Sequence, residues 1–264
     1  MARTRRSPRK SIPPVHEIRQ RLKRLARALL RQRGDFVRFT GDEKADRLLN
    51  DLIRAPHLFV IGSIADYQVK AEKAWNIPVA LARRAGGKSF GQVNALSRRS
   101  IRAVIKGPPA MHRFPAVVAD RIRRTLDRIA SQYGGDASRI WSGRPSSALV
   151  VYRFLEFHGI GQKVANMATN ILARSFAVPF ADHYSIDISV DVHVRRVMTR
   201  LGLVPPKATI EQVTFAARAL NPVYPGLMDL PCFHIGRTWC RPRRPLCGDC
   251  PMNGCCPSAR DEGK

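Results

Sequence analysis

A lysine just after a glycine-rich turn is the residue whose position most clearly indicates chemistry. A tight turn that opens a helix is predicted for Gly159-Ile160-Gly161-Gln162, because glycine tolerates positive φ and lets another backbone approach closely. The unpaired backbone N–H groups at such a helix start form a binding site for a phosphate group. Lys163 lies in the first turn, where the helix dipole disfavours a second positive charge and partial burial would do the same. Both effects favour a neutral amine, which is a nucleophile.

An aspartate that precedes the next helical run is the second candidate. Asp191, in the run Val190-Asp191-Val192-His193, is placed to cap this helix and also to face Lys163. Capping alone explains an aspartate at this position. The lysine upstream favours a catalytic role as well, and the two roles are compatible. His193 is expected to support the site or to pack in the core.

Four cysteines near the end of the chain have a spacing that could hold a metal ion or a cluster. They form the pattern Cys-x6-Cys-x2-Cys-x5-Cys at Cys240, Cys247, Cys250 and Cys256. Zinc sites are usually built from two pairs of ligands, each separated by two to four residues, and only Cys247 and Cys250 meet that rule. Zinc therefore stays open as a disfavoured alternative. Cys255 could replace its neighbour Cys256 as a ligand, whereas Cys232 is expected to be a small buried residue.

The charge balance indicates a nucleic-acid partner. Lysine and arginine number 46 against 20 aspartates and glutamates, which gives a formal net charge of +26. An excess of this size points to a polyanion, most often nucleic acid. No apolar run approaches the roughly 20 residues that span a bilayer, and no signal-peptide pattern is present, so we expect no membrane contact.

The turn, its lysine and the aspartate together carry a resemblance to a known family. The segment from His158 to Asn166, followed by Val190 to His193, resembles the helix–hairpin–helix and Gly/Pro-Asp signature of the endonuclease III superfamily of DNA glycosylases. In that family the lysine forms a Schiff base with the sugar C1′ and the aspartate supports it, which implies these roles for Lys163 and Asp191. Residues 159–162 would then contact DNA. The cysteine spacing is similar to that of the [4Fe–4S] cluster in endonuclease III, so the resemblance implies this cofactor, with the four cysteines of the pattern as its ligands.

The resemblance implies a bifunctional DNA glycosylase and AP lyase of base excision repair. A lyase needs an amine at the position of Lys163, so oxidised pyrimidines and abasic sites in double-stranded DNA are the expected substrates. The adenine-mismatch branch usually has an extra C-terminal domain, and the sequence ends soon after Cys256, which disfavours that branch. We expect a monomer, in the cytoplasm of a bacterium or archaeon, or in the mitochondrion or nucleus of a eukaryote. Alternatives are a monofunctional glycosylase, a non-catalytic cluster-bearing DNA-binding protein and a zinc-bearing nucleic-acid module.

Two further segments are candidates for DNA contact. Residues 64–70 occupy the place of the family's Leu-Ser-x-Gln-type motif, whose polar side chain fills the gap left by an extruded base. The sequence departs from that pattern, so Gln68, or Tyr67 by stacking, could act as the wedge, or the segment could be ordinary helix surface. The loop after the first cysteine of the pattern carries Arg241, Arg243 and Arg244. This loop could contact phosphates or compensate the charge of the thiolates.

Helix signals along the chain, with no alternating strand pattern, predict an all-α fold. One helix is expected to start at residue 15. The other expected helices cover 42–54, 58–75 with a possible break, 78–84, 97–106, 115–133, 147–175 as the helix–hairpin–helix, 209–220 and 228–238. The resemblance implies two domains with the active site in the cleft between them. A helical barrel domain would cover 42–178, and a helical iron–sulfur domain would combine 15–41 with 179–264.

Two segments fall outside these elements. Residues 1–14 read as a disordered basic tail, and a DNA-backbone arm or a mitochondrial transit peptide are alternatives for the basic N-terminal stretch. Residues 176–189 look like an insertion, because the lysine-to-aspartate spacing of the family is shorter. This insertion could contact the extruded base through His183 and Tyr184, or it could be an idle surface loop.

Overall fold

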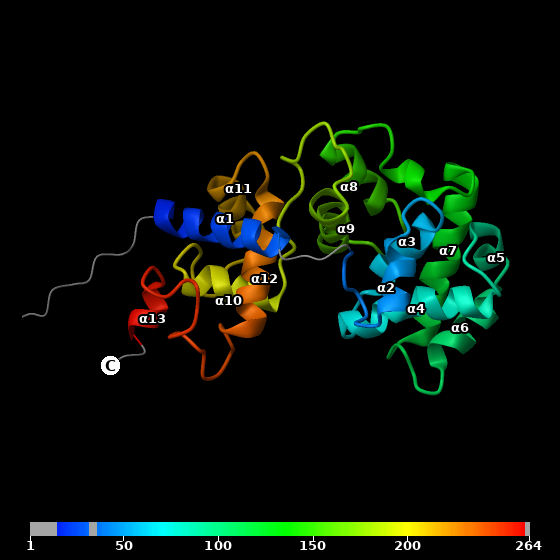
Figure 1. Ribbon diagram of the computed structural model, residues 1–264, viewed down its shortest axis with the longest axis horizontal. Coiled ribbons are helices and arrows are strands. Elements are labelled where there is room, and N and C mark those ends of the chain that lie inside the picture. Colours follow the sequence, from blue (N-terminus) through cyan, green and yellow to red (C-terminus); the bar gives the residue numbers. More distant parts are fainter. Residues whose placement is uncertain (1–14, 32–35, 262–264) are drawn as a thin grey trace, which may run out of the picture.

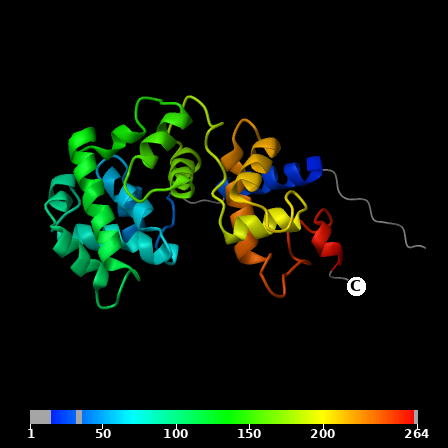
Figure 2. The same ribbon diagram turned by 180° about the vertical axis from the view of Figure 1, so that it is seen from behind.

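The chain forms two helical lobes that lie side by side (Figures 1 and 2). The computed structural model describes residues 15–31 and 36–261, and the basic tail predicted for 1–14 lies outside these ranges. Within the described ranges the chain is helical and contains no strand, as the all-α prediction requires. None of the helices in these ranges has the length and apolarity that a bilayer crossing requires.

The lobes are not consecutive in the chain, because the first helix belongs to the same lobe as the last helices. The first lobe contains α2 (Glu43–Asn50), α3 (Pro56–Ala65), α4 (Ala71–Arg84), α5 (Phe90–Asn94), α6 (Arg98–Lys106), α7 (Pro115–Tyr133), the 3-10 helix η1 (Ala137–Ile140), α8 (Ser147–Leu155) and α9 (Gln162–Ser175). The second lobe contains α1 (Val15–Arg31), α10 (Val192–Arg200), α11 (Ile210–Leu220), the 3-10 helix η2 (Pro225–Met228), α12 (Asp229–Thr238) and α13 (Pro257–Asp261).

Each lobe has its own hydrophobic core. Helix α1 buries Ile18 and Leu22 in the core of the second lobe, so the N-terminal helix packs with the C-terminal third of the chain. The first core extends slightly beyond residues 42–178, because Phe39, Phe180 and Ile186 pack into it. Two separate cores leave room for a cleft between them, and the chain passes from one to the other between α9 and α10.

Most predicted helices are present, and the differences have local causes. The helix expected over 58–75 is broken at Asp66 into α3 and α4. Pro78 does not start a new helix but lies inside α4, where its ring is buried. Burial of the ring compensates for the loss of the backbone hydrogen bond that proline cannot donate. Helix α5 was missed, although its capping box, Ser89 with Gln92, is a recognisable sequence signal.

A close approach between α3 and α4 fixes one wall of the cleft. Gly62 on α3 faces Trp75 on α4 so tightly that a Cβ at Gly62 would lie 2.3 Å from the indole ring. The indole also stacks on Phe39, with ring centroids 4.1 Å apart. The break between the two helices is thus held in place by a rigid aromatic cluster, which positions Asp66 at the end of α3.

The predicted insertion is a packed connector rather than an idle loop. Ile186 is fully buried, and its carbonyl accepts a hydrogen bond of 2.7 Å from the backbone N–H of Gly226. The carboxylate of Asp187 accepts two hydrogen bonds from Arg218 on α11, at 2.7 and 2.8 Å. Residues 176–190 therefore carry the chain from the first core to the second along a defined path.

Candidate active site and nucleic-acid interface

The predicted lysine and aspartate line the same cleft, which lies between the two lobes. The cleft has a volume of about 920 Å³. Lys163 comes from α9 in the first lobe, and Asp191 comes from the start of α10 in the second. The first lobe also contributes residues of the α3–α4 junction, and the second contributes one face of α12. The structure thus brings together two side chains that are 28 residues apart in the sequence.

Lys163 lies in the first turn of α9, directly after the hairpin. Helix α9 begins at Gln162, and its N-cap is Gly161, which has no side chain to accept from the first N–H groups. The start of α9 is therefore open to an external acceptor, as the glycine-rich turn predicts. Lys163 itself is exposed. Ile160 is the hairpin residue that is buried, and it anchors the turn in the first core.

Asp191 is the N-cap of α10, as its position in the sequence predicts. Its Oδ1 accepts hydrogen bonds from the backbone N–H groups of His193 and Val194, both at 2.8 Å. These bonds cap α10 and hold the carboxylate at the cleft wall. His193 packs edge-on against Phe233 with ring centroids 5.7 Å apart, which agrees with a supporting position.

Asp66 is a cleft residue that the sequence reasoning missed. It is the C-cap residue of α3 and lines the cleft, as does Trp75. Burial raises the pKa of Asp66 above its usual range, while the positive charge of Lys163 and the polar side chain of Trp75 act in the opposite direction. The negative charge of Glu72 raises this pKa further. Asp66 directly precedes the candidate wedge residues, but no sequence motif around it indicates that its carboxyl group belongs to a functional site.

A buried ion pair joins the two lobes at the back of the same cleft. Arg174 on α9 lies 3.1 Å from the carboxylate of Asp229 on α12, and both side chains are largely buried. The backbone N–H of Ser189 donates a second hydrogen bond to Asp229, at 3.2 Å. Burial raises the pKa of Asp229 and the charge of Asp191 adds to this, while Arg174 opposes both. No pattern in the sequence pairs these residues, which are 55 positions apart.

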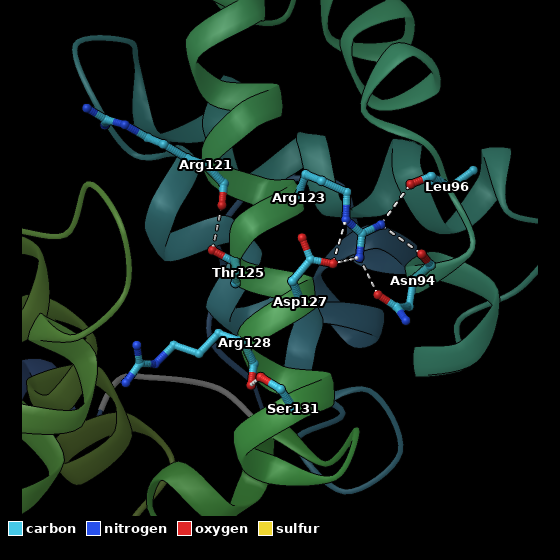
Figure 3. Close-up of polar contacts among 8 residues, drawn as sticks. All are labelled: Asn94, Leu96, Arg121, Arg123, Thr125, Asp127, Arg128 and Ser131. Atoms are coloured by element: carbon cyan, nitrogen blue, oxygen red, sulfur yellow. Dashed lines mark hydrogen bonds and ion pairs between the residues drawn. The ribbon is translucent and has the colours of Figure 1, made fainter.

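Helix α7 supports the hairpin through two arginines on one of its faces. Figure 3 shows Arg121 and Arg128 projecting to one side of α7, whereas Arg123 and Asp127 project to the other. Arg128 forms an ion pair of 2.7 Å with Glu156, at the end of α8. The side chain of Arg121 lies against the hairpin turn, since a Cβ at Gly159 would be 2.5 Å from its Nε.

Arg121 connects the hairpin to the candidate wedge residues. Its guanidinium lies over the ring of Tyr67, 4.5 Å from the ring centroid. Gln68 follows with a positive φ of 50° and an exposed side chain, a strained backbone conformation for a residue other than glycine. The two segments predicted to contact DNA therefore meet at one arginine, which the sequence reasoning missed.

The four cysteines of the pattern line one pocket in the second lobe. Cys240, Cys247, Cys250 and Cys256 surround it together with apolar residues of α10, α12 and the C-terminal turns. Cys255 does not line this pocket but is buried in the core, as is Cys232. Burial raises the pKa of Cys250 and of Cys256. Among the described residues, no three His, Cys, Asp or Glu side chains are close enough together to hold a single metal ion.

The basic loop between the first two of these cysteines is exposed, and hydrogen bonds from α10 hold the start of the loop. Arg241, Arg243 and Arg244 all face solvent, and none of them lines the cleft. Arg200 on α10 donates hydrogen bonds to the carbonyls of Arg241 and Pro242, at 2.7 and 3.2 Å, and its guanidinium lies 3.4 Å from the Cys240 sulfur. The charge next to that sulfur comes from α10 rather than from the loop itself.

His183 and Tyr184 are not cleft residues, which corrects the expectation that they could contact a base. His183 packs on Tyr224, with ring centroids 4.8 Å apart. Tyr184 is exposed outside the cleft. Only the last part of the connector reaches the cleft, through Ser189.

Comparison with known proteins finds endonuclease III among the relatives of the chain. No family model matches. The endonuclease III of Thermotoga maritima is 28% identical over 146 residues, which are 55% of this chain and 59% of that protein. The endonuclease III of Synechocystis is 31% identical over 106 residues, which are 40% of this chain and 44% of that protein. The chain thus spans about half the length of the named relatives it matches.

Solved structures extend the likeness over almost the whole chain. A trapped covalent intermediate of endonuclease III with DNA has a TM-score of 0.66 at 18% identity, covering 95% of this chain and 99% of that chain. A thermostable thymine-DNA glycosylase has a TM-score of 0.63 at 16% identity, covering 94% and 97%. At these identities the likeness shows the fold. The predicted helix–hairpin–helix glycosylase architecture and the resemblance to endonuclease III are confirmed.

The two hairpin glycines should respond differently to alanine. Gly159 has a φ of +85° and lies against Arg121, whereas Gly161 has a φ of −101° and open space at its Cβ. Gly159→Ala should lower the free energy of unfolding by about 1–2 kcal/mol, the cost of a left-handed conformation for an L-residue. Gly161→Ala should leave it unchanged or slightly higher. Urea denaturation without DNA measures both, and equal effects of the two substitutions would contradict this hairpin geometry.

Proposed function

We propose that the chain is a base-excision-repair DNA glycosylase with AP lyase activity. Its substrates are double-stranded DNA that contains damaged bases, oxidised pyrimidines among them, and abasic sites. The observation that carries the proposal is the shared cleft, which is lined by Lys163 and by Asp191, the N-cap of α10. Beside it, the backbone N–H groups at the start of α9 are free of side-chain caps and can bind a phosphate. A cleft of about 920 Å³ has room for an extruded nucleotide. The endonuclease III relatives and the fold support the same assignment.

The cleft residues divide the chemistry between them. The neutral amine of Lys163 attacks the sugar C1′ as the N-glycosidic bond breaks, and the bonding electrons leave with the base. The carboxylate of Asp191, fixed by two backbone N–H groups, stabilises the positive charge that develops on the sugar. Loss of the amine protons and opening of the sugar ring give an imine between Lys163 and C1′. Removal of a C2′ proton then expels the 3′ phosphate by β-elimination.

The four cysteines fit a [4Fe–4S] cluster better than a zinc ion. All four line one largely apolar pocket, while no group in the described ranges is tight enough for the short bonds of a tetrahedral zinc site. Four thiolates around one pocket match the ligand set of such a cluster. Bound there, the cluster would cross-link the end of α12 to the C-terminal turns. Its role is structural, because the proposed chemistry transfers no electron to or from the protein.

The DNA-facing surface combines the hairpin with the residues that converge on it. The open start of α9, with Arg121 against the hairpin, would bind the phosphates of one strand. Gln68, exposed at the strained break after α3, is the better wedge candidate, because the ring of Tyr67 is already covered by Arg121. The arginines at 241, 243 and 244 provide a second, separate phosphate contact on the second lobe.

Lys163 should be the residue that becomes covalently attached to DNA. Borohydride reduction on an abasic duplex should trap a protein–DNA adduct with the wild type, and Lys163→Ala should abolish both the adduct and strand cleavage while DNA binding remains. Lys70, a second lysine at the cleft, provides the matched control, and Lys70→Ala should still form the adduct. No adduct from the wild type would favour a non-catalytic DNA-binding protein. Base release without an adduct would favour a monofunctional glycosylase.

Adjacent cysteines should differ in their effect on the cluster. Cys256→Ala should lose bound iron and sulfide, together with the visible absorbance of the cluster, because Cys256 lines the pocket. Cys255→Ala should retain all three, because Cys255 points into the core instead. Iron and sulfide analysis of the purified variants checks this. A wild type that contains stoichiometric zinc and no iron would overturn the cluster assignment.

Arg121 should contribute one phosphate contact. Arg121→Ala should weaken DNA binding and reduce the slope of log K against log salt by about 1. Arg47, an exposed arginine that pairs with Glu43 on its own helix α2, is the charge-matched control. Binding titrations at several salt concentrations distinguish the two variants. The same change in slope for both would mean that only net charge matters at these positions.

A further inference from the structure

The turn after α3 combines two uncommon backbone conformations. Asp66 has a φ of −75° and a ψ of 66°, the angles of an inverse γ-turn, and the backbone N–H of Tyr67 donates a hydrogen bond of 2.8 Å to the carbonyl of Ala65. Gln68 follows with a positive φ of 50° and an exposed side chain. A residue with a Cβ disfavours this left-handed conformation, so the turn over residues 66–68 needs a contact from outside itself to keep it.

That contact comes from His112, in the loop between α6 and α7. The imidazole is 2% exposed, and its Nε2 lies 2.7 Å from the carbonyl oxygen of Tyr67. Its Nδ1 lies 3.0 Å from the backbone nitrogen of Phe114. A carbonyl oxygen can only accept a hydrogen bond and a backbone N–H can only donate one, so Nε2 carries the proton and Nδ1 accepts. The two neighbours thus select the neutral imidazole in a single tautomer.

The hydrogen bond from His112 acts on the peptide group next to the strained angle. The carbonyl of Tyr67 and the N–H of Gln68 belong to one planar peptide group. Because helices α3 and α4 anchor both ends of the turn, relaxation of Gln68 to a negative φ would turn this plane and carry the carbonyl away from the imidazole. The guanidinium of Arg121 packs on the ring of the same tyrosine. His112 therefore holds the backbone of the turn, while Arg121 holds a side chain.

We infer that His112 is a positioning residue for the wedge, because its Nε2–H keeps the turn in the conformation that presents Gln68 to the DNA stack. The inference rests on the proposed function, in which Gln68 fills the gap left by an extruded nucleotide. His112 is buried, so it acts through the turn and not by contact with DNA. Without its hydrogen bond, the turn would have to be arranged at each encounter with DNA, and entry of the wedge would be slower.

The rate of wedge entry tests this inference, on an abasic duplex that carries a fluorescent adenine analogue next to the abasic site. Entry of a side chain separates this base from its neighbour and raises its emission. In a Lys163→Ala background, which prevents cleavage, binding of the protein should raise the emission, and Gln68→Ala should reduce the rise. His112→Met removes the donor and should slow the rise by roughly 2- to 10-fold, the range set by the net contribution of one hydrogen bond.

Two further variants separate positioning from folding. His112→Gln places an amide N–H near the position of Nε2, so it should recover part of the rate that His112→Met loses. His57 provides the matched control, because it is another buried histidine of the first lobe, lies at the opposite end of α3, and has no hydrogen-bond partner for its Nε2 within the described ranges. His57→Met should leave the rate unchanged. Thermal melting of each variant is measured alongside.

A measurement on the unchanged chain does not depend on any variant folding. The NMR shifts of the two ring nitrogens of His112 should show a protonated Nε2 and an unprotonated Nδ1 at neutral pH. A proton on Nδ1 would oppose the N–H of Phe114 and would overturn the inference, whether the ring is the other tautomer or the imidazolium.

The outcomes separate this inference from the proposed function. A wild type that forms no borohydride adduct with an abasic duplex overturns the proposed function and the inference with it. A wild type that forms the adduct, with a rise in emission as fast in His112→Met as with His112 in place, retains the function and overturns the role of His112. Equal slowing by His112→Met, His112→Gln and His57→Met also overturns that role, because it would show a general loss of packing.

Discussion

The ion pair between Arg174 and Asp229 is the contact on which the geometry of the cleft depends. Arg174 lies on the same helix as Lys163, and Asp229 begins the helix that packs against α10, so the pair fixes the distance between the two walls. Both side chains are largely shielded from water, and removal of one partner from a buried pair typically costs 3–5 kcal/mol. A hydrogen bond of 2.8 Å from Asn170 to the carbonyl of Gly226 reinforces the same junction. Buried polar contacts therefore join the lobes, in addition to the packing of Tyr224, at the start of η2, against the first core.

The large positive charge is used in several distinct ways. On α7, Arg123 is held by the carbonyls of Asn94 and Leu96, at 2.7 and 2.8 Å, and so fixes the loop between α5 and α6 (Figure 3). Arg128 neutralises Glu156, whereas Arg121 has no ion pair within the described ranges and lies between Tyr67 and the hairpin. A net charge of +26 thus does not define a DNA surface by itself. Only the arginines whose charge is neither paired with a carboxylate nor held by backbone carbonyls are available to phosphates.

Local patterns predicted the elements of the fold and the paired site residues, but not the contacts between distant segments. The helix starts expected at residues 147 and 209 lie within one residue of the observed starts of α8 and α11. The motifs predicted that Asp191 would face Lys163, and the two residues line one cleft. Asp66 and Asp229 were missed, because their roles arise only when α3 and α12 meet the cleft. Burial, and hence the pKa of a carboxyl, is a property of tertiary packing that no local spacing encodes.

The exposure of Lys163 changes how the site must work. Lys163 is exposed, so the site does not position this amine by burying it. The dipole at the start of α9 contributes at most about 2 kcal/mol to the electrostatics there. The carboxylates that line the same cleft come from both lobes, namely Asp66 from the first and Asp191 and Asp229 from the second. The surroundings of the amine therefore depend on how the two lobes meet at the cleft rather than on the local sequence around the lysine.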